Sequence, residues 1–441
     1  MRKNIKISIA SVICAAFLAA CGTGKTTTSK EVSAATPQTD FHSYINADWL
    51  KETKLGKGQS QIDNLSQLTE KTQKAIQEMI DQLDMDYSNL EAGSDEKKLI
   101  NFYRLAADFE SRNRLGLEPV KPYLDEIQKA TSMADLNKVL ISLYGKNIRN
   151  VLNLSVTQDI MDSNKNSLYL DPHKLSFPKE NYEGTDDFSL KNQKAFKAYL
   201  EKVFVMAGAS SKEAATKAEK VFELEKELAA AQLPQEKAKD IKTAYNPKSW
   251  DDVKALAPNL PITELAANLG VQDAPFVVVT DPEGLKKVSE LYQEKHLEAL
   301  KALLQYRVIA HYSDYLSEDL IEAKAKYEGV ANGAVDIPTT DVLAQSAVEE
   351  NFSDMVGKVY VKNHFSEKSK ADIQAMVQEI KQTYAERIKP VQWMSEETKM
   401  QALKKLDTMV VKIGYPDKWR DYSNYTIQSK EEGGSIVSAV E

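Results

Sequence analysis

The sequence predicts a mainly α-helical protein with a small β-hairpin, and three observations carry that prediction. From residue 64 onward, apolar side chains recur with the period of an amphipathic helix almost throughout. One stretch, 152–156, instead alternates apolar and polar residues, which is the period of a half-buried strand. No segment recurs along the chain with a period of roughly 20–50 residues, which argues against a solenoid.

The first predicted helices lie between residues 64 and 144. Helix 64–84 carries one apolar stripe, made of Leu65, Leu68, Ile76, Met79, Ile80 and Leu83. A second helix, 99–109, is followed by the turn 115–119, whose glycine and proline end a helical pattern. Residues 120–129 and 133–144 continue the helical period.

Three short segments predict β-structure. Residues 152–156 and 167–170 are strand candidates, and the polar stretch 158–166 between them predicts a hairpin with a long loop. Residues 276–279 form a third strand candidate, because they are a short run of β-branched and aromatic residues.

Helices resume after the hairpin. They are predicted at 191–207, 211–232, 262–269, 281–291, 296–326, 342–363, 367–387 and 395–411. The stretch 296–326 is either one long helix or two helices with a break near Ser313. The mixed charges within 223–228 predict a solvated helix face.

The last residues predict an incomplete element. Gly433, Gly434 and Ser435 resemble a helix start, and the chain stops six residues later. Isolated helices are only marginal at roughly 12–15 residues, so we expect the chain to end within an element.

The first residues resemble the export signal of a bacterial lipoprotein. Arg2, Lys3 and Lys6 precede an apolar run, 9–20, that ends in small residues directly before Cys21. The run is too short to span a bilayer, which needs a helix of roughly 20 residues. Cys21 is therefore the predicted lipidation site, and the predicted location is the extracytoplasmic face of a bacterial cell membrane. An ordinary signal peptide with an incidental cysteine is the alternative.

Composition limits the possible partners. The chain has 57 basic and 65 acidic residues and a formal charge of −8. No stripe of basic and aromatic residues is present, so we do not expect nucleic acid as a partner. Cleavage before Cys21 would remove Cys14, which leaves one cysteine and excludes an internal disulfide framework. Residues 23–35 are small and polar, as in a flexible tether.

Four groups of segments share a pattern with one known family. They are 40–49 (DFHSYINADW); 101–103 (NFY) with the turn 115–119; 168–171 (LYLD) with 177–182 (FPKENY); and 393–399 (WMSEETK) with 412–419 (KIGYPDKW). In this order they resemble the neprilysin family of zinc metalloendopeptidases, which includes endothelin-converting enzymes and bacterial oligopeptidase O. The resemblance covers about residues 40–421.

The resemblance implies a fold and a class of substrate. The family has two mainly α lobes that enclose a chamber, a catalytic zinc ion, and oligopeptide substrates. By resemblance, the middle of this chain builds the lobe without the metal, which caps the chamber and limits access to short peptides. The catalytic lobe would be mostly missing, and a complementary catalytic half would be a partner.

The sequence lacks the zinc motif of that family. His-Glu-x-x-His places two zinc ligands and a general base on one helix face, and a further acidic ligand completes the site. The five histidines are His42, His173, His296, His311 and His364; none precedes a glutamate, and no two lie within five residues. We therefore predict no catalytic residue and no metal ligand here, and assign zinc to the full-length family enzyme. Glutamates near His296 and His364 are better explained as solvated helix surface.

Aromatic residues within the family motifs predict packing rather than chemistry. Tyr44, Trp49, Trp393 and Trp419 are expected to be core anchors, and Gly414 is expected to end a helix. The sequence also predicts an apolar face that a partner would cover. Its residues are Trp393, Met394, Leu403, Leu406, Met409, Val410 and Ile413.

The predicted organisation has four parts: a lipoprotein signal at 1–20, a tether at 21–38, a neprilysin-like N-terminal domain at 39–421, and the truncated start of a link to the catalytic domain at 422–441. The predicted function is the N-terminal part of a lipid-anchored zinc oligopeptidase, inactive alone. The alternative is a non-enzymatic surface lipoprotein that binds peptides or proteins.

Overall fold

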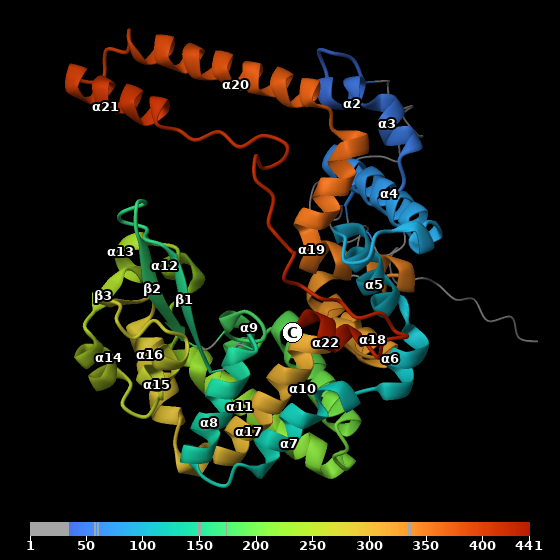
Figure 1. Cartoon of the computed structure of the whole chain (residues 1–441). Coiled ribbons are helices and arrows are strands. Elements are labelled where there is room, and N and C mark those ends of the chain that lie inside the picture. The colour runs from blue at the N-terminus through green and yellow to red at the C-terminus, as the bar shows by residue number, and fades with distance from the viewer. Residues whose placement is uncertain are drawn as a thin grey trace, which may run out of the picture. The chain divides into compact units, whose positions relative to one another are not determined.

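The structure is a computed structural model that describes residues 35–56, 59, 61–148, 151–172, 174–333, 335 and 337–441. The chain divides into two compact units, Met1–Gly56 and Lys57–Glu441. The described part of the first unit holds two short helices, α2 (Phe41–Ile45) and α3 (Ala47–Glu52) (Figure 1). Asp40 caps α2, because its carboxylate accepts a hydrogen bond from the Ser43 backbone N–H at 3.0 Å.

The second unit begins with the helices that the periodicity predicts. They are α4 (Asn64–Met85), α5 (Asp95–Ala107), α6 (Phe109–Leu115), α7 (Lys121–Lys129) and α8 (Met133–Gly145). The predicted stripe of α4 is buried only in its second half. Ile76, Met79 and Ile80 are buried there, whereas Leu65 and Leu68 in the first turns are exposed.

The predicted hairpin and third strand are confirmed, and they belong to one four-stranded sheet. Its strands are β1 (Leu152–Gln158), β2 (Asn166–Pro172), β3 (Asn246–Lys248) and β4 (Val277–Val279). The order is β1-β2-β4-β3, with β1 antiparallel to β2, β2 parallel to β4, and β3 antiparallel to β4. The strand β3 was not predicted, because three residues with a central proline carry no alternating pattern.

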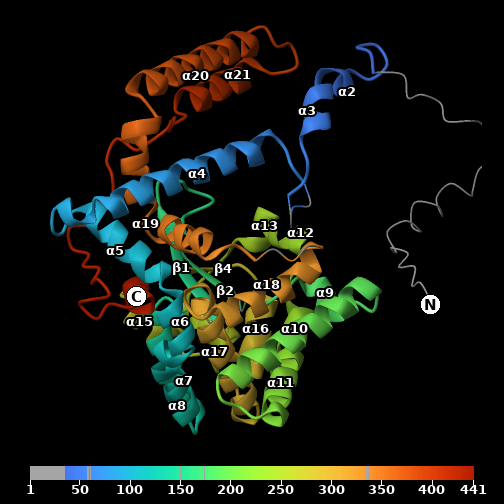
Figure 2. The ribbon, with the colours of Figure 1, turned by 90° about the vertical axis from the view of Figure 1, so that its right-hand side faces the viewer.

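Further helices follow β2 in the chain. They are α9 (Lys179–Glu183), α10 (Asp187–Met206), α11 (Ser211–Ala231), α12 (Gln235–Ala238), α13 (Ile241–Ala244), α14 (Trp250–Leu256), α15 (Ile262–Asn268), α16 (Pro282–Leu291), α17 (Leu297–Tyr312) and α18 (Glu318–Asn332). A short 3-10 helix, η5 (Ser313–Tyr315), separates α17 from α18, which confirms the predicted break near Ser313. Figure 2 shows α10 and α11 side by side.

The last helices are α19 (Thr340–His364), α20 (Glu367–Ile388), α21 (Glu396–Asp407) and α22 (Ile436–Val440). The backbone of α19 leaves helical geometry at Phe352, with φ −130° and ψ 39°. Among the described helices, none is both long enough and apolar enough to cross a bilayer.

The final segment packs onto the first helices of the second unit. The Lys98 ammonium donates to the Tyr422 carbonyl at 2.7 Å, and the Asn101 amide donates to the Ile427 carbonyl at 2.9 Å. Ile436 of α22 is buried. These tertiary contacts explain why α22 is helical although a helix of its length is not stable alone. The stability of isolated helices, on which the prediction rested, does not include such contacts.

Candidate functional site

The histidines are dispersed over different elements. His42 lies in α2, His296 directly before α17, His311 near the end of α17 and His364 at the end of α19, while His173 lies outside the described residues. Within the described part of the chain, no group of three or more His, Cys, Asp or Glu side chains could hold a metal ion. The described residues therefore do not fit the zinc site that the family resemblance implies.

The glutamates near His296 have other partners. Glu294 accepts a hydrogen bond from the Met133 backbone N–H at 3.2 Å, and Glu298 lies 3.4 Å from the Lys301 ammonium. The ring of His364 stacks on Tyr360, with 4.5 Å between ring centroids. The predicted lipidation site, Cys21, lies outside the described residues.

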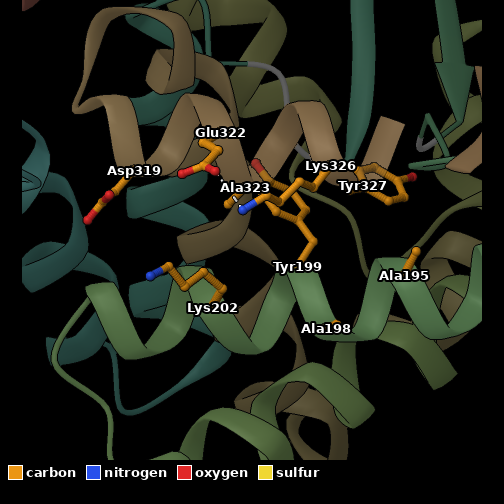
Figure 3. A pocket seen from close by; sticks show the side chains of 9 residues that line it. All are labelled: Ala195, Ala198, Tyr199, Lys202, Asp319, Glu322, Ala323, Lys326 and Tyr327. Atoms are coloured by element: carbon orange, nitrogen blue, oxygen red, sulfur yellow. Dashed lines mark ion pairs between the residues drawn. The ribbon is translucent and has the colours of Figure 1, made fainter. Parts of the chain in front are cut away.

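A pocket of about 320 Å³ lies between α10 and α18 (Figure 3). Small side chains form part of its wall, and charged side chains surround it. The lining residues are Ala195, Ala198, Tyr199, Lys202, Asp319, Glu322, Ala323, Lys326 and Tyr327. Its volume is at the lower end of the range for small-molecule pockets.

The chemistry of this pocket favours binding over reaction. The rings of Tyr199 and Tyr327 stack with 5.3 Å between centroids, and burial raises the pKa of both phenols. Both hydroxyls are therefore neutral at physiological pH. Glu322 forms an ion pair with Lys326 at 2.6 Å (Figure 3), so two of the four charges neutralise each other.

A buried ion pair lies beside the pocket. The Glu225 carboxylate is fully buried and lies 2.7 Å from the Arg307 guanidinium. It also accepts hydrogen bonds from the Tyr182 hydroxyl at 2.5 Å and from the Ser176 hydroxyl at 3.0 Å. Arg307 donates in addition to the Lys174 carbonyl. These bonds hold the segment 174–182, which follows β2, includes most of α9 and carries the sequence FPKENY.

The position of Glu225 corrects one prediction. The charged run 223–228 was predicted on a solvated face, and Glu225 is instead 0% exposed. The helical spacing could have shown this, because Glu225 follows Val221 by four residues and precedes Leu228 by three, and both are buried. Its neighbour Glu223 is exposed, as predicted.

A second buried cation joins distant segments. Arg112 donates to the carbonyls of Ala106, Leu316 and Asp314 at 2.6, 2.9 and 2.7 Å. Its guanidinium lies 3.8 Å from the Phe109 ring centroid. Burial lowers the pKa of Arg112 to about 10, so the group remains charged at neutral pH. The break between α5 and α6 is thereby tied to the segment between α17 and α18.

The segment 367–419, which we call the arm, has an uncovered apolar surface. It contains α20 and α21, and no residue of either helix is buried. Both figures show the two helices side by side (Figures 1 and 2). The exposed apolar side chains are Ile373, Met376, Ile380, Tyr384, Trp393, Met400, Met409 and Val410. Of the residues predicted on one helix face, Trp393, Met409 and Val410 are exposed but lie outside α21, while Met394, Leu403, Leu406 and Ile413 are half-buried.

The predicted aromatic anchor is wrong for Trp393, which is 79% exposed. Within the first unit, Tyr44 has no core to enter, because neither α2 nor α3 has a buried residue. Trp49 and Trp419 are half-buried, and Trp419 stacks on Tyr415 with 6.1 Å between ring centroids.

Gly414 has a different role from the predicted helix end, because α21 already ends at Asp407. Its φ is +70°, and a Cβ atom there would lie 2.5 Å from the Phe365 ring. The position therefore requires glycine for both backbone conformation and space.

Comparison with a family model identifies the scaffold. The model described as peptidase family M13 matches residues 37–416. Among curated proteins, the chain is 25% identical over 386 residues to a putative zinc metalloproteinase of Streptococcus gordonii, covering 86% of this chain and 68% of the relative. It is 23% identical to the neutral endopeptidase of Lactobacillus helveticus, covering 87% of this chain and 59% of that protein. Human endothelin-converting enzyme-like 1 is also 23% identical, and the match covers 86% of this chain and 51% of that protein.

Two solved structures show the same fold. The crystal structure of Mycobacterium tuberculosis zinc metalloprotease Zmp1 with an inhibitor matches with a TM-score of 0.82 and 24% identity, over 92% of this chain and 62% of that chain. The PepO structure from Lactobacillus matches with a TM-score of 0.79 and 21% identity, over 92% of this chain and 64% of that chain. This chain therefore spans about half to two thirds of the length of the proteins it resembles.

Proposed function

The chain belongs to peptidase family M13, and from this premise we propose that it forms the N-terminal, chamber-capping part of a lipid-anchored zinc metalloendopeptidase. The substrates of the whole enzyme would be short peptides. The observation that carries the proposal is the match to the family model over residues 37–416, combined with the uncovered apolar surface of the arm.

The arm supports the proposal of a missing partner. Met376, Ile380 and Tyr384 follow one another at four-residue intervals, so they share one face of α20. Contiguous apolar surface of this kind on a soluble protein marks an interaction site. In our proposal the arm packs against the remaining part of an M13 peptidase, which would carry the zinc ligands.

The rest of the second unit supports the capping role. Buried charges at Arg112 and Glu225 tie segments that are far apart in sequence, and the sheet and its helices share one hydrophobic core. A lobe held together in this way could keep a fixed shape over a chamber, since truncating buried polar networks is costly. The cap would then exclude large, folded substrates and admit short, extended ones.

The whole assembly would be held at the outer face of a bacterial membrane by a lipid on Cys21. The first residues support this proposal through their positive start, their apolar run and the small residues before the cysteine. A lipoprotein carries more than one acyl chain, and several chains give firm anchoring where one does not.

Zinc content and peptide cleavage test the proposal. The purified chain should bind less than about a tenth of an equivalent of zinc and show no chelator-sensitive cleavage of short peptides, because its described residues offer no ligand set for a catalytic zinc site. Thermolysin at the same concentration serves as the positive control. Stoichiometric zinc with chelator-sensitive cleavage that survives further purification would show that the chain is an enzyme by itself.

One observation favours the alternative of a non-enzymatic binding lipoprotein. The pocket between α10 and α18 is formed entirely by described residues of this chain and needs no second half. Under this alternative the Lys202→Ala variant would lose ligand binding, and its matched control Lys212→Ala on the neighbouring helix α11 would keep it. A chain with neither zinc nor any ligand in this pocket favours the peptidase-part proposal.

A further inference from the structure

We propose that the outer edge of β1, at Val156 and Gln158, binds an extended peptide segment as an added β-strand. The proposal goes beyond the function above, because an edge of this kind needs neither zinc nor the rest of an M13 peptidase. It rests on the direction of the backbone groups in β1, on their lack of partners, and on the composition of the strand.

Two contacts establish which residues of β1 direct their backbone N–H and C=O groups away from β2. The Tyr144 hydroxyl accepts from the Leu154 N–H at 2.5 Å and donates to the Leu154 carbonyl at 2.6 Å, on the side away from β2. The Asp159 N–H donates to the Lys165 carbonyl at 2.9 Å, across the hairpin. In an antiparallel pair, the N–H and C=O groups of one residue share a side, and the side alternates along the strand. The backbone N–H and C=O groups of the even-numbered residues of β1 therefore point away from β2, and those of the odd-numbered residues point toward β2.

Val156 and Gln158 are the outward-facing residues beyond Leu154. No other group in the described chain bonds to their outward N–H and C=O groups. The side chains of Val156 and Gln158 are exposed, and the Gln158 amide donates to the Ser163 carbonyl at 2.8 Å, which turns it toward the hairpin loop. The Tyr144 hydroxyl thus occupies the outward backbone groups of Leu154, whereas those of Val156 and Gln158 are open.

The composition of β1 is unusual for an open edge. Edge strands are commonly protected by lysine, other charged residues or proline, which discourage further strand pairing. Residues 152–158 (LNLSVTQ) contain none of these. Val156 and Thr157 are β-branched, as in strands that pair well.

The hairpin tip is held rigid beside this edge. The Asp159 carboxylate accepts from the Ser167 hydroxyl at 2.5 Å, the Tyr245 hydroxyl at 2.9 Å and the Met161 N–H at 2.7 Å. Hydrogen bonding from Ser167 lowers the pKa of Asp159, so this carboxylate stays ionised at neutral pH. A strand that is ordered before binding loses little conformational entropy when a peptide pairs with it.

The geometry specifies the kind of peptide. The backbones of Val156 and Gln158 offer two N–H donors and two C=O acceptors. An extended peptide can pair with them if its alternate residues have free backbone N–H and C=O groups. A β-branched or aromatic residue opposite Val156, whose side chain is 55% exposed, would add a cross-strand contact. Proline at either paired position would remove a donor and is disfavoured.

Hydrogen exchange at single residues tests the proposal, with the full chain and the peptide acetyl-Thr-Val-Thr-Val-Thr-amide as the probe. The peptide should slow exchange at Val156 and Gln158 by at least about tenfold, and leave Ser155 and Thr157 unchanged, because these already bond to β2. A version methylated at every backbone nitrogen should have no effect. Unchanged exchange at Val156 and Gln158 at millimolar peptide contradicts the proposal.

Two variants separate edge pairing from other modes of binding. Val156→Pro removes an outward N–H and no bond to β2, so it should weaken peptide binding at least about tenfold, whereas Val156→Thr should change it less than about twofold. Gln158→Pro provides a second test if Val156→Pro disturbs the protection of Ser155. Wild-type affinity in a correctly folded proline variant overturns the proposal. So does protection of Val156 that rises with protein concentration without peptide, because the occupant is then a second copy of the chain.

Discussion

Single residues define the rigid part of this molecule, and Glu225 is the clearest case. Its carboxylate has no contact with solvent, and its negative charge is balanced by Arg307 at 2.7 Å. Hydroxyl donors from Tyr182 and Ser176 complete its coordination. Because these four residues lie in α11, in α17, in α9 and in the connection between β2 and α9, the loss of the carboxylate would affect that connection as well as the α11–α17 contact.

Replacing Glu225 by alanine should therefore lower the free energy of unfolding by about 3 kcal/mol, because the Arg307 side chain, which is only 16% exposed, would lose its counter-charge. Urea unfolding measures this change. The matched control, Glu223→Ala, lies on the exposed side of the same helix and should change stability by less than about 0.5 kcal/mol. Equal effects of the two substitutions would show that the buried pair is not important for the lobe.

Predictions for single residues were correct where helical periodicity alone determines whether a side chain is buried. The burial of Ile76, Met79 and Ile80 follows from the helical spacing of α4. Glu225 and Gly414 were misassigned, because the first looks like its charged neighbours and the second needs a tertiary neighbour, Phe365, to explain it.

At the scale of elements, the hairpin and most helices could be predicted, since each has a local pattern of sufficient length. The strand β3 could not, because it consists of three residues, and its pairing with β4 depends on tertiary contacts. The sheet order β1-β2-β4-β3 was likewise inaccessible, since it joins strands more than a hundred residues apart. The buried C-terminal helix α22 depends on contacts with α5 in the same way.

The arm differs from the other elements because its helices bury no residue. Limited chymotrypsin treatment should cut first after Trp393, which is 79% exposed and lies between α20 and α21. A helical fragment that begins before Asn101 should persist, because α5 lies in the core. Mass spectrometry of the early products identifies the first cut, and Trp393→Ser should delay it. First cleavage within α10 or α17 would show that the core is less stable than the arm.

For the whole molecule, one substitution tests the anchoring proposal. Cys21→Ser should move the protein from the membrane fraction to the medium in the producing bacterium, because no described helix can span a bilayer and the thiol is the proposed lipid attachment point. Immunoblots of fractionated cells measure the distribution, and Cys14→Ser is the matched control, since Cys14 would be removed with the signal. A Cys21→Ser protein that stays in the membrane fraction would contradict lipid anchoring.

The whole molecule also combines a well-packed lobe with an uncovered arm. At about 25 cal/mol per Å², leaving roughly 400 Å² of apolar surface in water forgoes on the order of 10 kcal/mol. That amount is comparable with the stability of an entire domain. The buried hydrophobic core includes no residue of the arm, and neither of the arm's two helices buries a residue.

Hydrogen exchange along the monomeric chain tests this account most directly, by comparing residues 391–419 with α5 in the absence of any partner. The account predicts that amides of 391–419 exchange at least about a hundredfold faster than those of α5, because opening them exposes little buried surface. Equally slow exchange in the two regions would contradict it. Residues 391–419 would then be stable without a partner, and a non-enzymatic binding lipoprotein would be the better description of the function.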